Sequence, residues 1–158
     1  MRRQLGFSLT ELLIVVAIIL IIAAIAIPNI LRSRIVANET SAVESIRQIN
    51  AAESTYCWTY PTVGYSSDLG SLAGSNCTSQ TSSSACIIDN TLAAATSSNT
   101  SKSGYYFTYT PNSSVGYNLL GTPAEQGLSG GKNFYSDSTG AIHYNSGAPA
   151  GANDSVIQ

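Results

Sequence analysis

The carboxylate of Glu11 is the side chain whose place in the sequence most needs a chemical explanation. It stands next to Leu12–Ile27, a run of sixteen apolar residues without a charge. An isolated carboxylate in hydrocarbon costs several kcal/mol unless it is neutralised or paired with a cation. Glu11 must therefore reach water at the headgroup boundary of a membrane, or be paired with a positive group.

Other residues offer little material for catalysis or metal binding. His143 is the single histidine and has no second histidine or cysteine at ligand spacing, so we expect an ordinary strand residue. Asp137, Asp154 and Glu125 could offer loop oxygens to calcium, but their spacing does not resemble that of an EF-hand. The sequence therefore predicts no enzyme, no cofactor and no metal site.

Three cysteines allow one disulfide and one leftover thiol, a pattern that favours an exported domain. We favour a bridge between Cys77 and Cys86, because it closes a ten-residue loop in the least regular part of the sequence. In the chain-entropy description such a loop contributes about 2.7 kcal/mol. A bridge from Cys57 to either of the other two stays open, although we expect Cys57 to be a buried free thiol.

Composition argues against two broad classes of protein. Only 10% of the 158 residues are charged, against roughly 25% in an average soluble domain. The net charge of −2 gives no electrostatic basis for contact with nucleic acid, whose binders carry basic patches. The apolar residues are concentrated near the N-terminus. We therefore expect neither a nucleic-acid-binding protein nor an ordinary cytosolic enzyme.

The apolar run is long enough to cross a membrane as a helix. Residues 7–27 would rise about 32 Å, close to the roughly 30 Å of a hydrocarbon core. The Ile, Leu and Val residues of Leu12–Ile27 favour insertion by about 4–7 kcal/mol, whereas Glu11 costs at most about 3 kcal/mol. Three interpretations follow: a signal peptide cut after Ala26, a plain membrane anchor, or a precursor whose short basic leader ends at Gly6.

The residues around Gly6 favour the third interpretation. The leader of residues 1–6 is followed by FSLTELLIVVAII, which begins at Phe7, and the run continues to Pro28. This segment of about 30 residues resembles the N-terminal signature of type IV pilins and pseudopilins, and the short leader resembles the type IVa kind. The resemblance implies cleavage between Gly6 and Phe7 by a prepilin peptidase and N-methylation of Phe7. It also implies that Glu11 directs assembly by pairing with the Phe7 amine of a neighbouring subunit.

Pro28 falls inside a helical pattern that resumes at once. We expect a helix kink at Pro28, because proline removes a backbone hydrogen bond and clashes with the preceding turn. A helix end at Ile27 is disfavoured, since residues 29–56 keep helical periodicity. The apolar stripe of this second part consists of Ile35, Ala42, Ile46, Ile49 and Tyr56, with Val43 beside it. The charged residues that we place on other faces are Arg34, Glu39, Glu44, Arg47 and Glu53.

Residues 57–158 predict a small globular head. In the loop region 57–103 we expect short helical turns at residues 67–72 and 85–95. From about 104 to 146 the period changes to two, which predicts an antiparallel meander with a hairpin turn at residues 137–140. The expected strands cover residues 105–110, 115–120, 133–137 and 141–145. The fold class is therefore α+β: a leader (1–6), a transmembrane or filament-core helix (7–28), its amphipathic continuation (29–56), and a sheet head that ends in a C-terminal tail.

Together these features predict a structural protein. The favoured function is a type IV pilus subunit that polymerises through its N-terminal helix into a surface filament for adhesion, twitching motility or DNA uptake. The alternative is a pseudopilin of a type II secretion system, and a membrane-anchored extracytoplasmic binding domain is more distant. The resemblance implies a homo-oligomeric helical filament, the prepilin peptidase, and an inner-membrane assembly platform with its ATPase machinery. The precursor would cross the inner membrane once, with its N-terminus in the cytoplasm, before it joins the extracellular filament.

Overall fold

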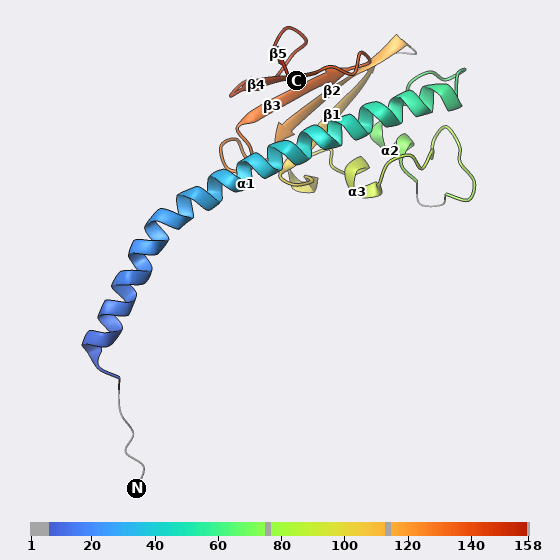
Figure 1. Ribbon diagram of the computed structural model, residues 1–158. Coiled ribbons are helices and arrows are strands. Elements are labelled where there is room, and N and C mark those ends of the chain that lie inside the picture. Colours follow the sequence, from blue (N-terminus) through green and yellow to red (C-terminus); the bar gives the residue numbers. More distant parts are fainter. Residues whose placement is uncertain (1–6, 75–76, 113–114, 158) are drawn as a thin grey trace. The chain divides into compact units, whose positions relative to one another are not determined.

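The computed structural model describes residues 7–74, 77–112 and 115–157 (Figure 1). The described helices are α1 (Leu9–Thr59), α2 (Leu69–Leu72), α3 (Asn90–Ala93) and the 3-10 turn η1 (Ser98–Thr100). The described strands are β1 (Tyr105–Asn112), β2 (Gly116–Pro123), β3 (Lys132–Asp137), β4 (Ile142–Ser146) and β5 (Ser155–Val156). The chain divides into two compact units between Arg34 and Ile35, so that each unit contains part of α1.

The first unit is an apolar helical stretch. Its large apolar side chains, from Phe7 to Leu31, are 47–78% exposed in the isolated chain. By length and composition, α1 is the one helix in the described part of the chain that could cross a membrane. Pro28 lies inside α1, and the residues on both sides of it are helical, which excludes a helix end at Ile27. The kink at Pro28 stays a prediction.

The second unit contains the five-stranded sheet, in the order β1-β2-β3-β4-β5 with every neighbouring pair antiparallel. This confirms the predicted meander and the α+β class. The first pair runs in register from Tyr105 opposite Pro123 to Asn112 opposite Gly116. The two-residue period of a strand places Tyr105 and Phe107 on the same face of β1, and both are fully buried.

The second half of α1 lies across the sheet in Figure 1 and supplies one wall of its core. Four members of the predicted apolar stripe, Ala42, Ile46, Ile49 and Tyr56, are buried. Burial of a large aliphatic side chain such as Ile46 contributes about 1.5–3 kcal/mol. Gly121 of β2 allows a close approach, since a Cβ atom there would lie 3.2 Å from Ile46 Cδ1. The stripe therefore fixes which face of α1 meets the sheet.

The predicted helical turn at residues 85–95 is wrong in its first half. Here the backbone pairs with a distant segment instead: Ala85 N donates to Ser71 O at 2.9 Å and Ile87 N to Leu72 O at 2.7 Å. Asp89 then caps α3, because its side chain accepts a hydrogen bond from Leu92 N at 2.8 Å. These long-range hydrogen bonds replace the local helical ones at residues 85–88.

At both edges of the sheet, the structure contains strand residues that were not predicted. β1 continues through Pro111, which pairs opposite Tyr117 and is tolerated because β1 is an edge strand. At the other edge, the C-terminal tail adds the short strand β5, which the sequence did not predict. Asp154 fastens this tail, because its carboxylate accepts hydrogen bonds from Asn145 Nδ2 at 3.0 Å and from Gly151 N at 2.8 Å.

Glu53 was predicted on a face other than that of the apolar stripe, which is wrong, because it is buried together with the stripe residues. Its side chain is completely buried between α1 and the segment around Ser66. Ser66 N donates to Glu53 Oε2 at 3.1 Å, and the Ser66 hydroxyl donates to Oε1. Tyr109 donates in turn to the Ser66 carbonyl at 3.1 Å. Burial raises the pKa of Tyr109, and the nearby Glu53 carboxylate adds to this effect, so Tyr109 remains a neutral donor.

We expect replacement of Glu53 to separate hydrogen bonding from charge. Glu53→Ala leaves the buried N–H and O–H groups of Ser66 unpaired and should lower the free energy of unfolding by about 2–3 kcal/mol. Glu53→Gln keeps one acceptor oxygen and should lose less than half as much. Urea unfolding of the full-length chain in detergent measures both values. Equal losses for the two variants would contradict the hydrogen-bonding role.

Candidate functional site

The first turn of α1 is organised by the carboxylate of Glu11. Ser8 directly precedes the helix, and its backbone N–H donates to Glu11 Oε2 at 2.9 Å. The carbonyl of Ser8 accepts the next helical bond, from Leu12 N at 3.2 Å. This is one half of a capping box, in which a residue three places into the helix pairs with the N–H of the capping residue. Glu11 therefore helps to start α1, besides any role between subunits.

This contact was not among the predictions from sequence, although the sequence contains a signal for it. A Ser or Thr followed three residues later by Asp or Glu, just before an apolar run, predicts a capping box, and Ser8-Leu9-Thr10-Glu11 has this spacing. A negative charge in the first turn also interacts favourably with the helix dipole. The same carboxylate can thus serve the helix terminus within one chain.

The cleavage junction is only half described. Phe7 is 78% exposed and directly precedes the Ser8 amide to which Glu11 is bonded. Gly6 and the rest of the leader lie outside the described residues. Cleavage between Gly6 and Phe7, and methylation of the Phe7 amine, stay predictions.

The surface that follows Glu11 is a continuous apolar helix. Every large apolar residue from Leu12 to Leu31 is at least 47% exposed, and they lie on all sides of α1. Such a surface has no convergent polar groups with which to hold a reactant. It is instead suited to contact with lipid or with similar helices, where close side-chain packing supplies the stabilisation.

The N-terminal segment of the chain is similar to segments of known proteins. The prokaryotic N-terminal methylation motif matches residues 1–27. The N-terminal segment of the chain is thus similar to that of type IV pilins. It is also 60% identical over 40 residues to the type IV wide pilus major component PilA4 of Thermus thermophilus. That alignment covers 25% of this chain and 30% of that protein, so the chain spans less than a third of the length of this pilin.

The disulfide lies in the head, away from the pilin motif in the sequence. Cys77 and Cys86 are joined, with their Cα atoms 5.7 Å apart, which is the pairing that the sequence favours. Cys57 is free and belongs to the last turns of α1. It is partly exposed rather than buried, since the neighbouring stripe residue Tyr56 takes the core position.

The side chains considered for metal binding serve other purposes. His143 lies in β4, and its Nδ1 forms a 2.8 Å hydrogen bond with the carbonyl of Asp154. Asp137 is the last residue of β3 and begins the turn before β4. Burial would raise its pKa, but hydrogen bonds from the hydroxyl and backbone N–H of Thr139 hold that pKa below its usual value. Within residues 7–74, 77–112 and 115–157, no three His, Cys, Asp or Glu side chains gather in a way that could hold a metal ion.

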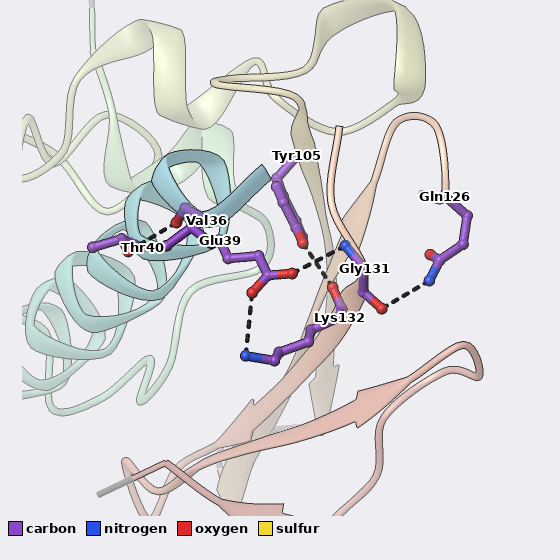
Figure 2. Close-up of polar contacts among 7 residues, drawn as sticks. All are labelled: Val36, Glu39, Thr40, Tyr105, Gln126, Gly131 and Lys132. Atoms are coloured by element: carbon purple, nitrogen blue, oxygen red, sulfur yellow. Dashed lines mark hydrogen bonds and ion pairs between the residues drawn. The ribbon is translucent and has the colours of Figure 1, made fainter. Parts of the chain in front are cut away.

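A second polar cluster fastens the connection between β2 and β3 to α1 (Figure 2). Glu39 Oε1 accepts a hydrogen bond from Gly131 N at 3.0 Å, and Oε2 forms an ion pair with Lys132 Nζ at 3.2 Å. Tyr105 donates to the Lys132 carbonyl at 2.8 Å. One residue earlier on α1, Asn38 Nδ2 donates to the carbonyl of Ser129 at 2.8 Å. Glu39 was predicted on a face of α1 other than that of the apolar stripe; its side chain is only 14% exposed, because it turns toward the β2–β3 connection.

We expect the two ion pairs on α1 to differ in strength. Glu39→Ala removes a largely buried acceptor from Gly131 and Lys132 and should lower the free energy of unfolding by about 1–3 kcal/mol. Glu44→Ala removes an exposed pair with Arg47 and should cost at most about 0.5 kcal/mol. Thermal unfolding of the two variants, compared with the unchanged chain, tests this difference. Similar losses would show that the Glu39 cluster adds no more than a surface pair.

Proposed function

We propose that the chain is the precursor of a type IV pilus subunit. The observation that carries the proposal is a carboxylate, Glu11, in the first turn of an exposed apolar helix that matches the prokaryotic methylation motif. Removal of the leader after Gly6 creates an amine on Phe7. The mature chain then begins with a cation four residues before its isolated anion.

Pairing between copies neutralises the carboxylate. In a packed bundle of apolar helices Glu11 has neither lipid headgroups nor bulk water to solvate it, so an unpaired charge would cost several kcal/mol. The Phe7 amine of an adjacent copy supplies the opposite charge. The Ser8 N–H already holds the Glu11 carboxylate near the start of α1, which limits the side-chain freedom that pairing removes. This pairing sets the axial register of the helices.

The apolar surface supplies the contact and the head remains outside. Before assembly the exposed side chains of residues 9–31 are covered by the inner membrane, and in the filament they are covered by other copies of the chain. The peptidase, the assembly platform and its ATPase act on this N-terminal segment. The similar pilin of Thermus thermophilus is described as a pilus component, which favours a pilus over the pseudopilus of a secretion system.

Intact mass and N-terminal sequencing of protein sheared from cells test the proposal. We expect a chain that begins at N-methylated Phe7 in the sheared fraction. A Phe7 start found only in membranes would favour the pseudopilin alternative or a minor subunit. A Met1 start, or a cut after Ala26, would contradict the pilin function.

A pair of substitutions at Glu11 separates charge from helix capping. Glu11→Ala should be processed and inserted in the membrane yet give at least tenfold less sheared filament, because the Phe7 amine of a neighbour has lost its partner. Glu11→Gln keeps an acceptor for the Ser8 N–H but carries no charge, and it should fail in the same way. Normal filament yield from Glu11→Gln would assign the residue to capping alone.

A further inference from the structure

We propose that a groove on the head, between the second half of α1 and the β3–β5 side of the sheet, receives the apolar segment of α1 from a second copy of the chain. The inference rests on the proposed filament function and names the surface that each copy offers to the next. The groove lies wholly within the second unit of the chain.

The groove is a surface hollow whose lining combines apolar and charged side chains. Its volume is about 550 Å³. One wall is the flank of α1 beside the core stripe, with Val36, Thr40 and Val43. The other wall comes from β3, β4 and the C-terminal tail. The apolar residues that line the groove, counted over both walls, are Val36, Val43, Phe134, Tyr144, Val156 and Ile157.

Two ion pairs border this apolar surface. Glu39 pairs with Lys132, whose Nζ also lies 5.5 Å from the ring centroid of Tyr144. Glu44 pairs with Arg47 on the outer side of α1. An apolar centre with a polar rim is the usual anatomy of a protein interface. Val36 and Val156, which are 61% and 51% exposed, are the apolar side chains with most area left to bury.

The charges of the groove select the kind of occupant. All four charged residues that line it are engaged in pairs with each other, so an occupant needs no charge of its own. A charged peptide or a nucleic acid would lack a free counter-charge there. The segment Leu12–Ile27 is uncharged, and its side chains are exposed in every copy. The chain therefore carries the matching ligand for its own groove.

Helical spacing gives that segment a row of anchors. Peptide helices bind grooves through residues at i, i+3, i+4 and i+7, which share one face. Ile14, Ile18, Ile21 and Ile25 follow this spacing on α1, and each is more than 50% exposed. Because the groove and the segment are different surfaces of one chain, their contact is heterologous and can repeat without closing. A helical filament is the natural product of such a contact.

Polar substitutions of the exposed valines test the groove against a matched control. The double variant Val36→Gln/Val156→Gln should give at least tenfold less sheared filament than the unchanged chain, with its thermal unfolding unaltered. Val115→Gln changes a 78% exposed valine that does not line the groove and should assemble normally. Normal yield from the double variant would overturn the groove as a receptor. An equal loss from Val115→Gln would do the same.

Cysteine cross-linking identifies the occupant, in a Cys57→Ser background that keeps the native disulfide. Thr40→Cys is combined with Cys at Ile14, Ile18, Ile21 or Ile25 in turn, and filaments are oxidised and separated without reductant. We expect a ladder of covalent multimers from at least one combination and from no single variant. Dimers of Thr40→Cys alone would indicate a symmetric groove-to-groove contact and overturn the proposal.

The outcomes also distinguish the groove from the filament function. Normal filaments without a ladder would overturn the groove and leave the pilus function standing. Failure of the unchanged chain to form filaments would remove both.

Discussion

The central constraint on this molecule is that the first part of α1 cannot remain in water. Its large apolar side chains, from Phe7 to Leu31, are at least 47% exposed in the isolated chain, and the adjacent carboxylate of Glu11 must be satisfied in the same apolar setting. Each exposed Ile or Leu forgoes about 1.5–3 kcal/mol until it is covered. In the proposed function, lipid covers it before assembly and other copies cover it afterwards, so the surroundings of α1 change with the state of the protein.

The second part of α1 solves the opposite problem, because the chain itself covers it. The stripe from Ala42 to Tyr56 packs on the sheet, and two carboxylates fix the helix against the head. Glu53 binds the segment around Ser66, while Glu39 binds the β2–β3 connection. Polar contacts of this kind tolerate no shift in register, since a displaced helix would leave a buried charge unpaired. One helix thus has an exposed apolar surface in its first part and, in its second part, a face that is fixed against the head.

Local periodicity predicted the parts of this fold that depend on local chemistry. The stripe containing Ile46 and Ile49, the core strands and the antiparallel order all follow from repeats of 3.6 and 2 residues. Prediction failed where a residue's environment is set by a partner far away in the sequence. Glu53 is buried because Ser66 supplies hydrogen-bond donors, and the backbone of residues 85–88 pairs with that of residues 71–73. The same holds for β5, whose two residues have no pattern of their own. In the candidate site, the contact between Ser8 and Glu11 was predictable from its spacing, whereas the Glu39 cluster was not.

The C-terminal tail links these features to assembly. The disulfide closes only residues 77–86, so the tail depends on hydrogen bonds and on apolar packing for its position. The carboxylate of Asp154 holds it through Asn145 and Gly151, and its backbone carbonyl bonds to His143. This places Val156 and Ile157 in the wall of the groove. Ile157 also packs against the hydrophobic core of the head, so the same residue joins the wall of the groove to the fold. The tail therefore belongs to the surface between copies as much as to the fold.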